Sequence, residues 1–159
     1  MPRFRCVPIP TETAARWRAG GRDDRGNTLV ERIVDGPGFP CRHCLRLGEP
    51  GERMLLGSYD LPRPQGVYWT PSPIFLHAQD CPRFTAEDEI APIVLAPGIV
   101  SVRSYDAAQM CLYDLGAISE GPDVAPILAR AVADPRTRFI NIHTARPGCL
   151  LTAVEKLPD

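Results

Sequence analysis

Lysine and long apolar runs are both scarce in this chain of 159 residues. Lys156 is the only lysine, and the net charge is −1 at neutral pH. No large basic surface for nucleic acid or for an anionic membrane is therefore indicated. No window approaches the roughly 20 apolar residues of a membrane span, so no transmembrane helix is expected. Met1 to Pro10 lacks the apolar segment of a signal peptide, and we expect a cytoplasmic protein.

The expected cytoplasmic location determines how the six cysteines are interpreted. Thiols are kept reduced in the cytosol, so these cysteines are expected to be metal ligands, catalytic groups or small buried residues rather than three disulfides. Almost all the positive charge is arginine, whose planar guanidinium suits bidentate binding of carboxylate or phosphate. A GC-rich genome would produce the same arginine and proline bias without any anion site.

Short alternating segments dominate the pattern of apolar residues. Helices are predicted at residues 11–18 and 124–133. The predicted strands are residues 4–9, 29–34, 53–59, 74–78, 99–105, 111–118, 138–144 and 149–154. Most connections are too short for helical crossovers. We therefore predict one α+β domain over residues 1–159, with a largely antiparallel sheet of about six to eight short strands and two or so helices.

All three histidines lie close to a cysteine. The clusters are Cys41-Arg42-His43-Cys44, His77-Ala78-Gln79-Asp80-Cys81 and the segment from His143 to Cys149. Thiolate sulfur and imidazole nitrogen are the ligands that zinc prefers. This pairing indicates metal or thiol chemistry without naming a substrate.

The first two clusters together predict a metal site within residues 38–82. Cys41 and Cys44 lie in a turn between Gly38 and Gly48, where both sulfurs can face one ion, and an apolar segment suited to a hairpin follows. His77 and Cys81, after 32 intervening residues, supply the second half of the site. We predict that Cys41, Cys44, His77 and Cys81 bind a structural zinc ion. One departure from treble-clef and related zinc modules is Leu45, where such knuckles often place glycine.

Other chemistry uses the same atoms. Cys41-x-x-Cys44 would also suit a dithiol redox pair, although the usual strand-to-helix context is missing. Cys41-x-His43 fits half of a Rieske motif, but His77 precedes Cys81 in the wrong order, and an iron–sulfur cluster would have to recruit Cys111 or Cys149. The alternative function is a metal-free enzyme with a cysteine nucleophile or redox centre, in which His43 lowers a thiolate pKa.

A second candidate site lies on the later strands. Phe139, Asn141, His143 and Ala145 alternate onto one face, and Arg103 and Tyr105 share a face of their own segment. Arg103, Tyr105, His143 and Arg146 would together suit a small anionic molecule. A solvated sheet face would show the same pattern.

Two segments carry a family resemblance. Gly38-Phe39-Pro40-Cys41-Arg42-His43-Cys44-Leu45, followed by the segment from Ser72 to Cys81, resembles a family of short bacterial proteins catalogued as domain of unknown function 1203. The similarity runs over nearly the whole chain and implies a single bacterial domain without an assigned activity. The C-terminal motif departs from the family pattern, which has a histidine near Asn141 and an arginine near His143. That swap weighs against a family-wide role for His143.

Overall fold

Two antiparallel sheets form the framework of the protein, described for residues 2–159 by a computed structural model. Residue 1, with which the expected domain begins, lies outside this description. The strands are β1 Phe4–Val7, β2 Val30–Ile33, β3 Arg53–Asp60, β4 Pro71–His77, β5 Ile99–Tyr105, β6 Ala117–Glu120, β7 Phe139–Thr144 and β8 Leu150–Lys156. The helices are α1 Thr11–Gly20, α2 Pro92–Leu95 and α3 Ala125–Ala133, with 3-10 turns at Gly66–Tyr68, Tyr113–Leu115 and Gly121–Asp123. The predicted α+β class is confirmed.

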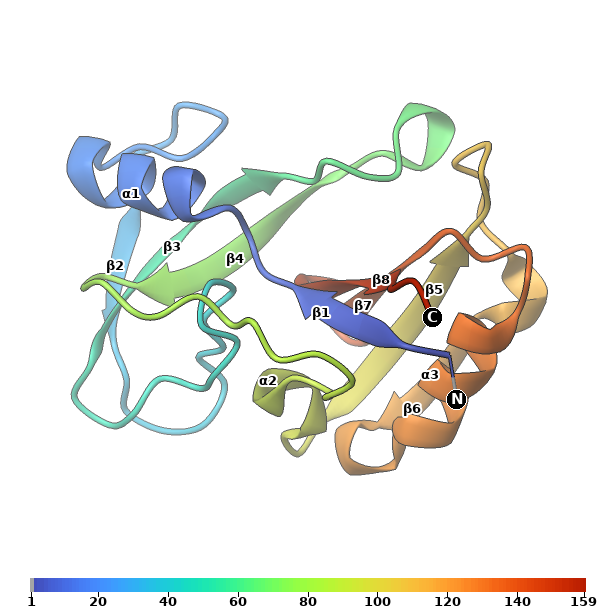
Figure 1. The fold of residues 1–159 in the computed structure, drawn as a ribbon. Coiled ribbons are helices and arrows are strands. Elements are labelled where there is room, and N and C mark those ends of the chain that lie inside the picture. Colours follow the sequence, from blue (N-terminus) through green and yellow to red (C-terminus); the bar gives the residue numbers. More distant parts are fainter. Residues whose placement is uncertain (1) are drawn as a thin grey trace.

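The larger sheet has the strand order β1-β8-β7-β5-β6. Helices α2 and α3 cover one of its faces (Figure 1). Ile140 and Ile142 of β7 point to this side and pack in one core cluster with Leu128 of α3. Because side chains alternate along a strand, Phe139, Asn141 and His143 face the opposite side, toward the smaller sheet. They are buried as well, so β7 is covered on both faces.

The smaller sheet has the order β2-β3-β4, and α1 packs against it (Figure 1). Trp17 of α1 is fully buried in a second core cluster that also contains Met54 and Ile74. Gly57 of β3 makes room for the indole, since a Cβ at this position would lie 2.8 Å from Cζ3 of Trp17. The helix can approach the sheet closely only because residue 57 lacks a side chain.

Side chain-to-backbone hydrogen bonds join the two sheets. The Ser72 hydroxyl of β4 accepts a hydrogen bond from the Leu150 amide of β8 at 2.8 Å. Arg42 is buried and donates through Nε to the Leu150 carbonyl at 2.6 Å. The Arg42 carbonyl in turn accepts from the Ile9 amide at 3.0 Å. Arg42 therefore connects the Cys41–Cys44 turn to both the larger sheet and the segment before α1.

The strand predicted at residues 111–118 is wrong in most of its length. Cys111 forms only an isolated bridge with Tyr105, and β6 begins at Ala117. Asp106 starts a turn, because its carboxylate accepts hydrogen bonds from the amides of residues 108 and 110. The following 3-10 turn buries Leu115 while Tyr113 stays exposed. Local hydrogen bonds thus determine the structure of this segment in spite of its alternating apolar residues.

No helix within residues 2–159 has the length and apolar character needed to cross a membrane.

Candidate metal centre

A tight turn between Phe39 and Gly48 presents the first cysteine pair. The Cys41 amide donates to the Arg46 carbonyl and the Leu45 amide donates to the Cys41 carbonyl, each at 2.9 Å. The Gly48 amide closes the loop on the Phe39 carbonyl at 2.8 Å. These bonds turn the chain back on itself, so the side chains of Cys41 and Cys44 project to the same side.

Leu45 has the backbone conformation that glycine usually supplies. Its φ is 56°, in the left-handed region that a non-glycine residue adopts at a cost of about 1 kcal/mol. The side chain is fully buried in the core beneath the larger sheet, and the Leu45 carbonyl accepts a hydrogen bond from the Ile93 amide at 3.1 Å. Burial of the leucine offsets the backbone strain, which explains the departure from the usual knuckle sequence.

Substitution of Leu45 tests this balance. Leu45→Ala should lower the free energy of unfolding by about 3 kcal/mol, because it empties a core site and keeps the strained backbone. Leu45→Gly removes one further carbon yet relieves the strain, so we expect a smaller loss of about 2 kcal/mol. Denaturant titration of wild type and both variants measures the order. Glycine more destabilising than alanine would contradict the role assigned to the left-handed backbone.

Four side chains converge beside this turn. The Sγ atoms of Cys41, Cys44 and Cys81 and a ring nitrogen of His77 all lie within 4.8 Å of one another. His77 is the last residue of β4 and pairs with Met54 across the β3–β4 hairpin. The chain then turns through residues 78–80 and brings Cys81 back to the same point. The predicted half-sites, separated by 32 residues, therefore form one cluster.

The distances within the cluster suit a tetrahedral ion. Metal bonds of about 2.3 Å to sulfur and about 2.0 Å to nitrogen at tetrahedral angles place two sulfurs about 3.8 Å apart, and a sulfur and a nitrogen about 3.5 Å apart. The Sγ atoms of Cys41 and Cys81 are 3.8 Å apart, and Cys44 Sγ lies 3.5 Å from His77 Nδ1. Both separations match the values expected for a tetrahedral ion. The three cysteines are free, so no disulfide bond accounts for the short distances.

The protonation of the cluster depends on the contacts among its own members. Hydrogen bonding with the Cys44 and Cys81 side chains holds the pKa of Cys41 well below its usual range. Hydrogen bonding to Cys41 raises the pKa of Cys44 far above its usual range and that of His77 to about 10. One thiolate therefore forms readily while a second beside it is unfavourable. A divalent cation would stabilise all three thiolates and displace these protons.

Polar groups around the cluster orient two of its members. Arg18 of α1 donates through Nη2 to Cys81 Sγ and through Nε to the His77 carbonyl, at 3.3 and 2.9 Å. The Nε2 atom of His77 lies 3.2 Å from a carboxylate oxygen of Glu52. That contact leaves Nδ1 facing the sulfurs, as in the carboxylate–histidine pairs that surround many metals.

His43 contacts the cluster from outside it. Its Nδ1 lies 3.3 Å from Cys81 Sγ, and its Nε2 lies 2.9 Å from the Thr11 hydroxyl. Burial lowers the pKa of His43, so the ring is neutral at pH 7. A neutral ring with Nδ1–H donating to the sulfur and Nε2 accepting from Thr11 satisfies both nitrogens. His43 therefore supports Cys81 and is not one of the four converging groups.

One side of the cluster opens to a surface hollow of about 410 Å³. Cys44, His77 and Cys81 line it together with Arg46, Glu49 and Glu52. Cys41 lies behind them and is fully buried. Small chelators can therefore reach the cluster, while the deepest sulfur is protected.

The residues of the predicted anion cleft are partly separated. Register pairs Arg103 with Asn141 and Ser101 with His143, so Arg103, Tyr105 and His143 share the face of the larger sheet that looks toward the smaller one. Tyr105 is stacked on Phe139 with ring centroids 4.9 Å apart. Arg146 lies in the turn after β7 and lines a hollow with Gly98, Ile99, Glu120, Thr144 and Pro147. A shared cleft stays a prediction.

Sequence reasoning missed the groups that surround the metal cluster. Arg18, Glu52 and Thr11 come from α1 and from the loop before β3, far from the cysteine motifs along the chain. Arg18 gave no signal because arginine is common in this sequence and its spacing from Cys81 follows no motif. Glu52 precedes a predicted strand, and only the β3–β4 pairing brings it within reach of His77.

Comparison with known proteins bears on the whole arrangement. The family model described as protein of unknown function (DUF1203) matches residues 38–156. No curated protein and no solved structure matches the chain. The matched segment spans three quarters of the 159 residues and includes both cysteine–histidine half-sites and strands β3 to β8. The resemblance seen in the sequence is thus confirmed, and the chain belongs to the DUF1203 family.

Proposed function

We propose that the protein binds one structural zinc ion through Cys41, Cys44, His77 and Cys81. The observation that supports this best is the convergence of four ligand atoms within 4.8 Å of one another, with the Cys41–Cys81 and Cys44–His77 separations at the values that a tetrahedral ion requires. A zinc ion here would join the Cys41–Cys44 turn to the end of β4 and to the segment leading into residue 83. Three thiolates and a neutral imidazole give the site a net charge of −1, which the Arg18 guanidinium balances.

The ligand set favours zinc over iron. A Rieske centre needs two histidines, whereas His77 is the one imidazole among the four converging groups. A [2Fe–2S] or [4Fe–4S] cluster needs four thiolates, and neither Cys111 nor Cys149 is among the converging groups. Three sulfurs and one nitrogen in a tetrahedron are a common structural zinc set.

The thiol-enzyme alternative gains less support from the geometry. Cys41, whose pKa is lowered, is fully buried, and a nucleophile needs access to its substrate. Cys81 is more accessible, and its contacts with Arg18 and His43 would suit a reactive thiolate, but the same contacts equally suit a thiolate bound to zinc. A closed four-ligand ion has no open position for a substrate. A structural site in a cytoplasmic protein is the simpler proposal.

Metal content tests the proposal. Protein purified without an affinity tag should contain about one zinc per chain by elemental analysis, and its thiols should react slowly with iodoacetamide until a chelator is added. Chelation should expose the three ligand cysteines. Less than about 0.2 zinc per chain, with all these thiols reacting at once, would contradict a structural zinc site.

A further inference from the structure

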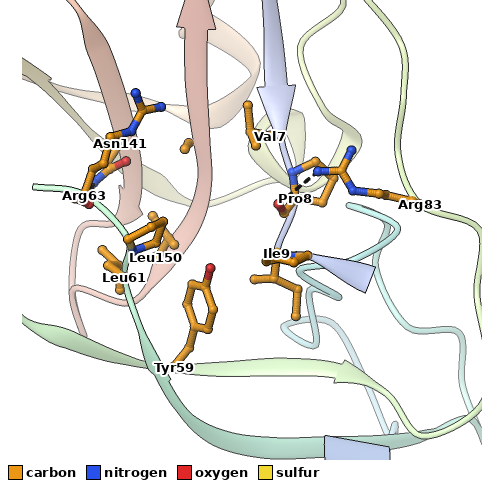
Figure 2. A pocket seen from close by; sticks show the side chains of 12 residues that line it. Val7, Pro8, Ile9, Tyr59, Leu61, Arg63, Arg83, Asn141 and Leu150 are labelled. Atoms are coloured by element: carbon orange, nitrogen blue, oxygen red, sulfur yellow. Dashed lines mark hydrogen bonds between the residues drawn. The ribbon is translucent and has the colours of Figure 1, made fainter. Parts of the chain in front are cut away.

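A cavity of about 170 Å³ lies at the junction of the two sheets (Figure 2). Its walls come from the segment between β1 and α1, from β3 and the residues after it, and from β7 and β8. The lining residues are Val7, Pro8, Ile9, Pro10, Tyr59, Leu61, Pro62, Arg63, Arg83, Asn141, Leu150 and Ala153. Junctions between packed layers are a common place for small-molecule sites, and this one is separate from the proposed zinc cluster.

The walls of this junction cavity are mostly apolar. Leu61 and Leu150 lie on one side of it and Pro8 and Ile9 on the other, and the hydroxyl of Tyr59 points into the space between them (Figure 2). That hydroxyl makes no hydrogen bond within residues 2–159 and is free to donate to a ligand. An apolar cavity of about 150 Å³ accommodates benzene. The junction cavity therefore has room for one ring or one short branched chain.

The charged groups at the junction cavity are both arginines. No aspartate or glutamate lines it. Arg63 is already engaged, since its guanidinium lies 4.5 Å above the Phe139 ring and 3.7 Å from a Glu155 carboxylate oxygen. Arg83 makes one weak contact, from Nη2 to the Pro8 carbonyl at 3.5 Å, and has no carboxylate partner within residues 2–159. Most donors of Arg83 are therefore available to an anion.

We propose that the junction cavity binds a small carboxylic acid that has a single ring or a short branched chain. The apolar body lies among Leu61, Leu150 and Ile9, and the carboxylate accepts hydrogen bonds from the Arg83 guanidinium and the Tyr59 hydroxyl. Arginine matches a carboxylate with two parallel N–H donors, which separates an acid from a neutral molecule of the same shape. The site differs from the cleft predicted around Arg103 and does not depend on which metal is bound.

The test uses the zinc-loaded chain of 159 residues, because Arg83 follows Cys81 by two residues and α1 contacts the cluster through Arg18. Benzoate is the probe and benzamide its neutral counterpart, each titrated into ¹⁵N-labelled protein and followed by amide chemical shifts. Benzoate should shift the amides of Val7, Ile9 and Tyr59 with a dissociation constant of about 1 mM or tighter. Benzamide should bind about tenfold more weakly.

Three variants locate the binding. Arg83→Gln should weaken benzoate binding about tenfold, because it removes the charged donor. Ala153→Leu should abolish binding by filling the space, and its amide spectrum reports whether it is folded. Arg22→Gln is the matched control, since Arg22 is also an exposed arginine held by one backbone carbonyl, that of Gly26 at 3.1 Å; its affinity should be unchanged.

Either of two results with wild-type protein alone would overturn the proposal. One is the absence of shifts at the junction-cavity amides up to about 20 mM benzoate. The other is equal affinity for benzoate and benzamide. Zinc content is measured separately on the same samples, so failure of carboxylate binding and failure of the zinc proposal are distinguishable.

Discussion

Removal of the proposed zinc ion should lower the free energy of unfolding by more than about 5 kcal/mol, and Cys44→Ser should do the same. Binding free energy at a structural zinc site is folding free energy, because the unfolded chain has no preformed site. In this protein the cluster ties a loop, the end of β4 and α1 together through Cys44, His77 and Arg18. Without the ion, a thiolate and the neighbouring thiols would be left close together in a half-buried site.

Thermal melts followed by circular dichroism, before and after chelation, measure this loss. Added zinc should restore the wild-type melt and leave Cys44→Ser unchanged. Cys111→Ser is the matched control, because Cys111 is a partly buried free cysteine outside the cluster; it should melt close to wild type. An unchanged melting temperature in protein shown to be metal-free would mean that the cluster contributes little to stability.

His143 should make the protein lose stability in mild acid. Its ring is buried, Nδ1 lies 2.9 Å from the Gly148 carbonyl, and Nε2 has no partner within residues 2–159. Burial lowers the pKa of His143 to about 4, with a further contribution from the charge of Arg103. Between the ordinary pKa of about 6.5 and this value, the unfolded chain binds a proton that the folded protein does not.

The sign of the effect follows from that difference. Above pH about 6.5 the ring is neutral in the folded and the unfolded state, so it has no effect on stability. As the pH falls to about 4, the neutral buried ring lowers the free energy of unfolding by up to about 3 kcal/mol. Below pH about 4 this loss of stability grows no further. Denaturant titrations in excess zinc compare the free energy of unfolding at pH about 7 and pH about 5 for wild type, His143→Asn and His143→Phe. Over this range, wild type should lose about 2 kcal/mol more than either variant. Both variants should share the shallower slope although they differ in stability at neutral pH. Parallel curves for all three proteins would rule out this origin.

Local patterns in the sequence determined much of the fold. Alternation of apolar residues predicted β3, β5 and β7 close to their observed bounds, because each lies in a sheet with at least one buried face. It failed at residues 111–118, where the Asp106 turn and the 3-10 turn around Asp114 satisfy the backbone locally. A pattern of apolar residues does not record such hydrogen bonds.

For the four converging ligand residues, the sequence indicated which residues are involved and the tertiary structure brought them together. Spacing alone indicated Cys41, Cys44, His77 and Cys81, because thiolate and imidazole are the ligands that zinc prefers, although the same residues also suited thiol chemistry. Their convergence depends on the β3–β4 hairpin, which brings the end of β4 beside the knuckle.

Tertiary structure alone decided the remaining features. Leu45 keeps a left-handed backbone because the core beneath the larger sheet buries its side chain. Arg18 reaches Cys81 because α1 packs on the smaller sheet, and the junction cavity exists because the two sheets meet there. These features join residues far apart along the chain, and no local pattern encodes such distances.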